Sequence, residues 1–318
     1  MNSARLEATR DAYGKALVDL GKDNKDVVVL DADLSCSTKT STFRKVFPER
    51  FINCGVAEQD MICTAAGLAA SGKIAFASTF AVFGSGRAWD QVRISVAYPR
   101  LNVKIVVTHG GITVGEDGAT HQALEDIAIM RALPNMTIIV PADSVETYKT
   151  IKAVAAFHGP SYVRLGRSAV PVISDSVDQD FIIGKSVLYR EGIDVAIIAC
   201  GIMVAKAIDA SEELAKEGIS ARVINMHTIK PMDKTAVIKA AKETGAIVTA
   251  EEHSVIGGLG SAVSEIVCEE FPVPVIKIAV EDTFAESGKP DDLLEKYGLT
   301  AKDIVAAAKR ALLLKNKK

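Results

Sequence analysis

The chain has 318 residues, of which 48% are apolar and 24% are charged, and its formal net charge is −3. This near-neutral balance gives no electrostatic footprint for nucleic acid or for a membrane surface, and we expect neither as a partner. No apolar run reaches the ~18 residues of a membrane-spanning helix, and the opening MNSARLEATRDAYGKAL lacks the apolar core of a signal peptide. The five cysteines are scattered without CxxC spacing, which predicts reduced thiols in a cytoplasmic protein rather than disulfides or a zinc site.

Short apolar strands alternate with helical stretches along the first half of the chain. The apolar segments are VVVLDAD from Val27, IAFASTF from Ile74, KIVVTH from Lys104, TIIVPAD from Thr137 and YVRLGR from Tyr162. A helix is expected at Gln59–Ser71. This alternation predicts a parallel α/β sheet with helices on its faces.

A polar and less regular stretch, VISDSVDQDFIIGKS, follows at Val172 to Ser186 and predicts a linker. A second series then contains DVAIIAC, ARVINM, GAIVTAEE and PVIKIAV, with helical patterns at Val204–Glu217 and Asp233–Glu243. Single cores rarely grow beyond ~250 to 300 residues, so this length suggests about two domains. We expect a parallel-sheet domain in residues 1–171, a linker in 172–190 and a smaller α/β domain in 191–318.

The stretch VTHGGITVGEDGATHQ, from Val107 to Gln122, is called the histidine loop below. It follows the strand VKIVV, which is largely β-branched and apolar without alternation, as is typical of a strand buried on both faces of a parallel sheet. Ligands of open α/β sheets bind beyond the carboxyl ends of the strands, so His109, Asp117 and His121 could converge on one polar molecule. By spacing alone, a surface turn with solvated histidines fits equally well.

The histidine loop resembles the substrate loop of transketolase, whose usual form is THDSIGVGEDGPTHQ. Further segments resemble the same family in the same order: ATRDAYGKAL, DADLSCST, GVAEQD, STFAVF and EDTFAESGKPDDLLEKYGLT. Together they cover essentially the whole chain, yet they correspond to only the second half of a transketolase. The resemblance implies a pyrimidine-binding domain followed by a C-terminal domain, as in the C-terminal subunit of a split transketolase.

Such a subunit implies thiamine diphosphate catalysis, the chemistry of the pentose phosphate pathway. Glu58 stands where the family places the glutamate that faces the cofactor's aminopyrimidine and helps to remove the thiazolium C2 proton. Phe80 and Phe83 match the aromatic pair around the pyrimidine, because a flat ring packs well against a flat heterocycle, and Asp33 matches the acidic residue near the thiazolium. Without the resemblance, Glu58 would be an ordinary acid in a helix's first turn, the phenylalanines core residues and Asp33 a helix cap.

The resemblance also divides the substrate site between a phosphate end and a sugar end, which call for cationic and for hydrogen-bonding groups respectively. The residues that match the phosphate end are Arg10, Ser37, His109 and Arg167. Asp117 matches the residue that selects the sugar's C2 hydroxyl, and His121 matches one that bonds the donor's oxygens. We count Glu58, His109 and His121 as the catalytic set, since a histidine pKa lies near neutrality.

Two positions depart from the family's usual pattern. Gly110 and Gly111 replace an Asp-Ser pair beside His109, which puts the donor preference in question, and Ala57 and Gln59 replace the usual arginine or histidine neighbours of the glutamate. The chain also lacks the GDG motif and later asparagine through which the family binds the diphosphate by way of Mg²⁺. The resemblance therefore implies no metal ligands here, a separate N-terminal subunit that supplies them, and a heterotetramer built on a self-associated core of this chain.

Two related enzyme classes share this architecture, the β subunit of a 2-oxoacid dehydrogenase and half of a deoxyxylulose phosphate synthase. The form of the histidine loop disfavours both. A catalytically silent binding or regulatory relative is the alternative outside the enzymes. The segment GGLGSAV from Gly257 lacks GxGxxG spacing and predicts a strand-to-helix turn, and His158, His227 and His253 are expected to be structural or surface residues.

Overall fold

A computed structural model describes residues 5–176 and 180–316, so the outermost ends of the predicted domains and residues 177–179 of the predicted linker lie outside it. The elements of the first half are β1 (Leu6–Ala8), α1 (Thr9–Asp23), β2 (Val27–Asp31), α2 (Ser35–Thr38), α3 (Ser41–Val46), η1 (Pro48–Arg50), β3 (Phe51–Asn53), α4 (Glu58–Ala70), β4 (Ile74–Ser78), η2 (Phe83–Arg87), α5 (Trp89–Gln91), η3 (Val92–Ala97), β5 (Val103–Val107), η4 (Ile112–Asp117), α6 (Asp126–Arg131), β6 (Thr137–Ile139), α7 (Ser144–Ala156), β7 (Ser161–Arg164), β8 (Ala169–Pro171) and η5 (Ser174–Ser176). Those of the second half are β9 (Val187–Arg190), β10 (Val195–Ala199), α8 (Met203–Lys216), β11 (Ala221–Asn225), β12 (Thr228–Lys230), α9 (Lys234–Thr244), β13 (Ile247–Ser254), α10 (Leu259–Glu270), β14 (Val275–Val280), α11 (Pro290–Lys296) and α12 (Ala301–Lys315).

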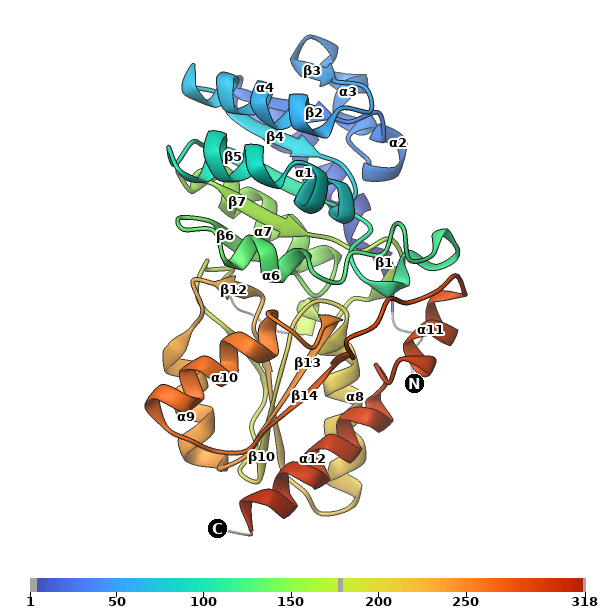
Figure 1. The fold of residues 1–318 in the computed structure, drawn as a ribbon, viewed down its shortest axis with the longest axis vertical. Helices are drawn as coiled ribbons and strands as arrows, with labels where there is room; N and C mark the ends of the chain where they lie inside the picture. The colour runs from blue at the N-terminus through green and yellow to red at the C-terminus, as the bar shows by residue number, and fades with distance from the viewer. Residues whose placement is uncertain (1–4, 177–179, 317–318) are drawn as a thin grey trace.

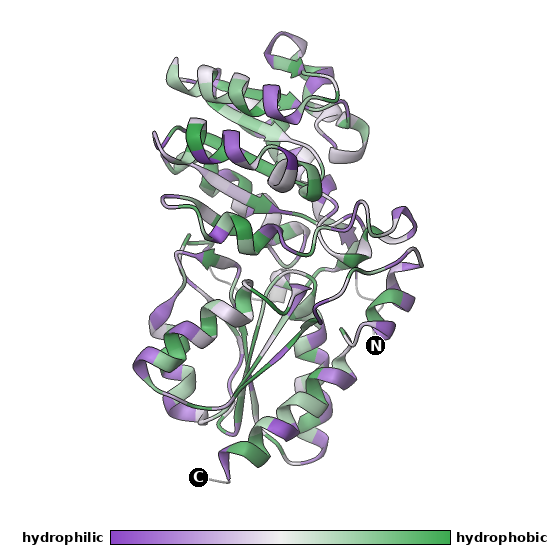
Figure 2. Ribbon diagram, viewed as in Figure 1, coloured by the Kyte–Doolittle hydropathy of each residue, from purple (hydrophilic) through white to green (hydrophobic). Residues whose placement is uncertain are grey.

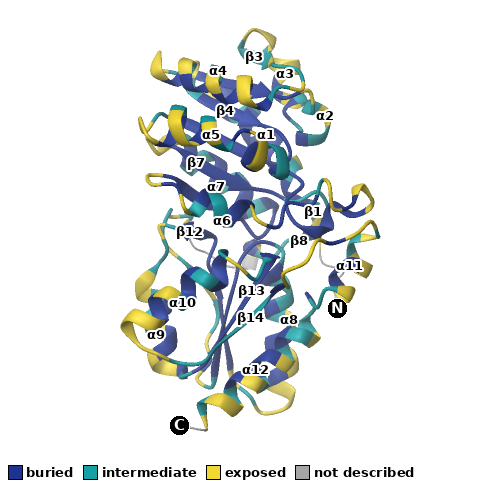
Figure 3. Ribbon diagram, viewed as in Figure 1, coloured by how far each residue is buried: buried dark blue, intermediate teal, exposed yellow. Residues whose placement is uncertain are grey.

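The first half builds a seven-stranded sheet in the order β12-β6-β7-β5-β4-β2-β3, which is parallel except at β12. Successive residues of its strands enter different cores. Val27 and Val29 pack with α1, α3 and α7, whereas Val28 and Leu30 pack with α4, η3 and α6. Both faces are therefore covered, and Figure 3 shows the inner strands of the sheet as buried, whereas the edge strand β3 is partly exposed. This arrangement confirms the parallel sheet predicted from the apolar runs.

The second half builds a five-stranded sheet in the order β14-β13-β10-β11-β9, parallel except at β9. Helices α8 and α12 cover one face, and α9 and α10 cover the other. Strand β10 is wholly apolar and β13 begins apolar but ends in EEHS, while hydrophilic residues concentrate on the outer faces of the helices (Figure 2). Figure 1 shows the two sheets as separate bodies along the long axis of the molecule, which confirms the predicted two-domain α/β fold.

The two halves are joined through strand β12, which the sequence did not predict. It follows β11 in the chain but pairs antiparallel with β6 at the edge of the seven-stranded sheet. The His227 carbonyl next to it accepts a hydrogen bond from the Val140 N–H at 2.8 Å. One apolar core runs across this junction, including Val140 from the first half and Met226 and Ile229 from the second.

Two general properties of the described residues complete the fold. Within the described residues, no helix combines the length and apolar character that crossing a bilayer requires. The five cysteines all lie in the described part of the chain, and each is a free thiol.

Candidate active site

The predicted site residues gather beyond the carboxyl ends of the parallel strands. Asp33 follows β2, Glu58 opens α4 after β3, Phe80 follows β4, and His109 follows β5. Arg167 follows β7 in the same way. Neighbouring parallel strands end at one edge of the sheet, which is where open α/β sheets bind their ligands.

Glu58 is a buried carboxylate at the amino terminus of α4, with 1% of its surface exposed. The helix N-terminus favours its negative charge. Its Oε2 accepts a hydrogen bond from Arg87 Nη1 at 2.9 Å, and the Arg87 guanidinium also lies 4.8 Å from the centroid of the Phe83 ring. The sequence reasoning missed Arg87, which supplies a cationic neighbour that Ala57 and Gln59 do not.

Four rings meet beside this pair. Phe80 stacks on His109 with ring centroids 3.8 Å apart, and on Phe83 at 6.1 Å. His121 lies edge-on to Phe83 at 5.4 Å. Phe80 is buried whereas Phe83 is only partly buried, so Phe83 keeps surface available to a ligand. The rings bring together side chains from the ends of two strands and from the histidine loop.

His109 adopts a left-handed backbone with φ of 60°, and its Nδ1 lies 2.8 Å from Thr108 Oγ1. Burial, followed by the charges of Arg10, Arg167 and His121, lowers the pKa of His109 to about 3. The imidazole is therefore neutral at physiological pH. It can exchange hydrogen bonds with a ligand but brings no positive charge to the site.

Positive charge comes from two arginines next to His109. Arg10 Nη1 donates to the Ser37 carbonyl at 3.0 Å, so this contact uses the Ser37 backbone rather than its hydroxyl. Arg10 Nε is buried and has no hydrogen-bond partner within the described residues. Burial lowers the pKa of Arg10, and Arg167 lowers it further against the opposing effect of Asp11.

Asp117 belongs to the same group through Arg167. Arg167 Nη1 lies 3.7 Å from Asp117 Oδ2 and 3.2 Å from Glu116 Oε2, and it donates to the Val114 carbonyl. Asp117 is exposed at the tip of the histidine loop. The structure thus brings Arg10, Arg167, Asp117 and both loop histidines into one polar cluster.

Asp33 is set apart from that cluster. Its side chain is exposed, and its Oδ1 accepts from Asn53 Nδ2 at 2.9 Å while its N–H donates to Asn53 Oδ1 at 3.1 Å. It shares the strand edge with the ring group, but its hydrogen bonds pair it with Asn53.

Gly110 and Gly111, the departures beside His109, pack against different domains: Gly110 faces Arg164 of β7, and Gly111 faces Glu252 of β13 in the C-terminal domain. A Cβ at Gly110 would lie 2.8 Å from Arg164 Nε, and one at Gly111 would overlap the Glu252 carboxylate. Arg164 and Glu252 are both buried, and the sequence reasoning named neither. The glycine pair is therefore explained by two side chains packed behind the loop.

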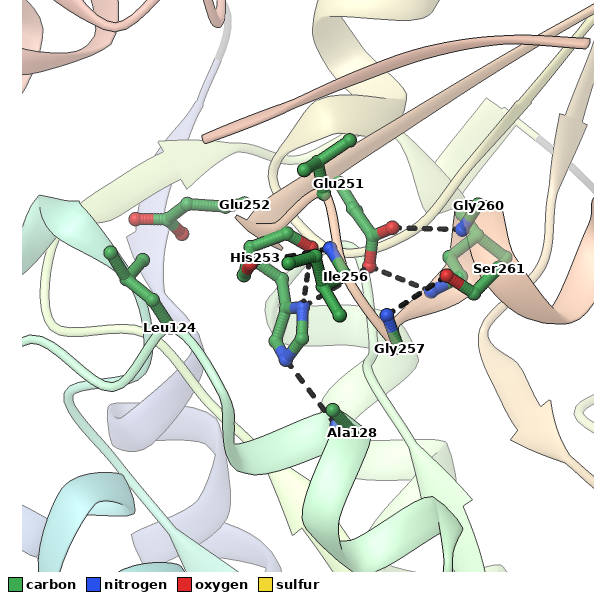
Figure 4. Close-up of polar contacts among 12 residues, drawn as sticks. Leu124, Ala128, Glu251, Glu252, His253, Ile256, Gly257, Gly260 and Ser261 are labelled. Carbon is green, nitrogen blue, oxygen red and sulfur yellow. Dashed lines mark hydrogen bonds and ion pairs between the residues drawn. The ribbon is translucent and has the colours of Figure 1, made fainter. Parts of the chain in front are cut away.

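The GGLGSAV segment is confirmed as a strand-to-helix turn between β13 and α10. Glu251 already occupies the amino terminus of α10, because its two carboxylate oxygens accept from the Leu259 and Gly260 N–H groups at 2.7 and 2.8 Å (Figure 4). His253 and His227 are buried, and His158 is exposed. Across residues 5–176 and 180–316, no group of three or more His, Cys, Asp or Glu is arranged to hold a metal ion.

Comparison with known proteins gives the family. Residues 7–172 match the model of the transketolase pyrimidine binding domain, and residues 184–304 match that of the transketolase C-terminal domain. A Methanocaldococcus jannaschii chain, provisionally named as a transketolase C-terminal section, is 51% identical over 304 residues, covering 95% of each chain. A 6-deoxy-6-sulfo-D-fructose transketolase subunit of a Clostridium species is 48% identical, covering 96% of this chain and 95% of the relative.

A solved structure, described as the inactive beta4 tetramer of a split gene transketolase, superimposes with a TM-score of 0.90 at 57% identity. The superposition covers 97% of this chain and 99% of that one. The chain therefore belongs to the transketolase family, of which it carries the pyrimidine-binding and C-terminal domains.

Proposed function

We propose that this chain is the C-terminal subunit of a two-chain transketolase. The enzyme uses thiamine diphosphate to transfer a two-carbon ketol unit from a ketose phosphate to an aldose phosphate. The observation that carries the proposal is the joint placement, at one sheet edge, of a buried carboxylate, stacked rings and an arginine pair.

The donor set fits the pyrimidine end of thiamine diphosphate. Glu58 is a buried carboxylate that can form a hydrogen bond with a ring nitrogen, and Phe80 and Phe83 offer flat apolar surface next to it. When bound, thiamine diphosphate would supply a nucleophilic thiazolium carbon for the chemistry at a sugar carbonyl. Arg87 keeps a positive charge beside Glu58, and we assign Asp33 to the thiazolium side on the family pattern alone.

The polar cluster fits a sugar phosphate. Arg10 and Arg167 supply positive charge for the phosphate, and the buried Arg10 Nε is a hydrogen-bond donor without a protein partner in the described part of the chain. We assign Ser37 and His109 to the same end. Asp117 and His121 then serve the sugar end, where an acidic acceptor and a neutral imidazole can bond hydroxyl and carbonyl oxygens. The preferred ketose stays open.

We further propose that the active assembly needs a separate N-terminal subunit, which supplies the Mg²⁺ ligands and completes the cofactor site in a heterotetramer. The sequence matches only the second half of the full transketolase pattern. A relative of this same half is described as an inactive tetramer, which supports a chain that self-associates and needs a partner for activity. We place the assembly in the cytoplasm, where free thiols such as these persist.

Glu58→Gln is the direct test of the cofactor assignment. It keeps the side-chain shape but removes the carboxylate, so ketol transfer by the reconstituted enzyme should fall about 100-fold or more. Asp60→Asn is the matched control, since Asp60 is an exposed acid in the same first turn of α4. Glu58→Gln activity near wild type, with an intact complex by size-exclusion chromatography, would contradict the assignment.

A further inference from the structure

The C-terminal domain holds the histidine loop along much of its length. The Thr113 N–H donates to Glu252 Oε1 at 2.7 Å, and Gln122 Nε2 donates to the Glu286 carbonyl at 3.0 Å. Helix α11 packs against η4, the segment that leads to Asp117. The loop that carries the candidate substrate residues is therefore built against the second domain.

Glu252 is placed for this contact by strand β13. Its side chain is 5% exposed, and burial raises the pKa of its carboxyl against the lowering effects of Arg164 and of the Thr113 N–H. Arg164 Nη2 donates to the Glu252 carbonyl at 2.9 Å, while its Nε donates to Asp126 Oδ2 at 2.9 Å. Arg164 thus holds the Glu252 backbone against the first domain, while the Glu252 carboxylate accepts from the Thr113 N–H of the loop.

Residues of the first domain also form hydrogen bonds with the same part of the loop. Ser168 Oγ donates to the Thr113 carbonyl at 3.3 Å, and Arg167 donates to the Val114 carbonyl. Arg167 also pairs with Asp117. Any shift of Thr113 therefore moves the peptides that set the positions of Arg167 and Asp117.

We propose that Glu252 is a positioning residue for sugar phosphate binding: its carboxylate anchors the Thr113 peptide and so fixes the arrangement of His109, Asp117 and Arg167. This inference rests on the proposed function, because it assigns the ligand of the loop to that reaction. Glu252 itself lies behind the loop, and its proposed role requires no contact with substrate.

Glu251 provides a matched control on the same strand. It is also buried and also accepts backbone N–H groups, but successive side chains of a strand point to opposite faces, and it binds the start of α10 instead of the loop. Figure 4 shows the two carboxylates extending to opposite sides of β13. A merely structural contribution to stability should be similar for both residues.

The first test is steady-state kinetics of the reconstituted two-chain enzyme with xylulose 5-phosphate and ribose 5-phosphate. Glu252→Ala should raise the KM for both sugars about tenfold, which corresponds to about 1.4 kcal/mol of lost binding free energy. It should leave the apparent Kd of thiamine diphosphate within about twofold. Glu252→Gln should restore most of the affinity, since its amide oxygen can still accept from Thr113, and Glu251→Ala should leave KM unchanged. Equal KM changes in the two alanine variants would overturn the proposal.

The second test reads the loop without turnover. In hydrogen exchange of the complex, Glu252→Ala should accelerate exchange over residues 110–118, and Glu251→Ala should accelerate it over 257–264. If the wild-type complex shows no ketol transfer, the proposed function fails while this measurement still decides whether Glu252 holds the loop. Unchanged exchange over 110–118 in Glu252→Ala would overturn the inference whatever the activity.

Discussion

Gly111→Ala is expected to destabilise the chain strongly, because two separate features of Gly111 exclude a side chain. Its backbone has φ of 85° and ψ of −172°, a region that is essentially restricted to glycine. An added Cβ would also overlap the Glu252 carboxylate. That carboxylate can rotate away only by giving up its hydrogen bond from the Thr113 N–H.

The magnitude follows from these two features. Holding alanine in this backbone region costs about 1–3 kcal/mol. Leaving the buried Thr113 N–H without its acceptor costs about a further 1–3 kcal/mol. The smaller conformational freedom of alanine in the unfolded chain offsets about 0.4–1 kcal/mol of this. The free energy of unfolding should therefore fall by about 1–5 kcal/mol.

Chemical denaturation at one fixed protein concentration measures the effect, because a self-associating chain has concentration-dependent stability. Gly67→Ala is the matched control: Gly67 lies inside α4 with open space around its Cβ position, so alanine there should stabilise by about 0.5–1 kcal/mol. The double variant Gly111→Ala with Glu252→Ala should lose less stability than the sum of the single variants, since the overlap is gone. A change at Gly111 within about 0.5 kcal/mol of wild type, or strict additivity, would refute the reasoning.

Three further outcomes are expected. Phe83→Ala should raise the apparent Kd of thiamine diphosphate more than it lowers Tm, whereas Phe43→Ala, in the buried core, should cost about 3–5 kcal/mol without touching cofactor affinity; equal loss of apo stability in both variants would make Phe83 a core residue. Asp117→Ala should weaken the discrimination between aldoses that differ in configuration at C2, and unchanged selectivity in competition assays would count against that role. Burial is the first cause that lowers the pKa of His109 to about 3 and of His227 to about 4. The unfolded chain binds these protons from about pH 6.5 downward, so the contribution of each histidine to stability should decline as pH falls from about 6.5 toward 4. Burial raises the pKa of Glu146 to about 7, which acts in the opposite sense over the same range, so the measurement is the difference in denaturation midpoint between wild type and His227→Gln; a difference that does not change with pH would contradict the reasoning.

Much of the fold is predictable from local sequence. The strand predicted at Val103–Val107 is β5, and the helix predicted at Gln59–Ser71 is α4 with each end shifted by one residue. Strand β12 was missed because three residues, TIK, carry too little pattern, and no local signal says that they join the sheet of the other domain. The antiparallel edge strand β9 was missed for the same reason, because its four residues, VLYR, follow an irregular stretch.

The candidate site likewise contains residues that local sequence predicts and residues that it does not. Glu58, the phenylalanines and the loop histidines lie in contiguous motifs, so the sequence could name them. Arg87 meets Glu58 across 29 positions, and Glu252 meets Thr113 across 139. The first contact is set by packing within the first domain and the second by packing between the two domains, and neither leaves a periodic or spacing signal in one sequence. The placement of Gly110 and Gly111 against Arg164 and Glu252 became intelligible only in three dimensions.

The most direct test of the central claim is ketol transfer from xylulose 5-phosphate to ribose 5-phosphate with thiamine diphosphate and Mg²⁺. It should be measured for this chain alone and for its complex with the native N-terminal subunit. The account predicts turnover by the complex and none by the chain alone. Turnover by the chain alone would contradict the split site, and an intact complex that binds thiamine diphosphate but turns over neither sugar would contradict the proposed reaction.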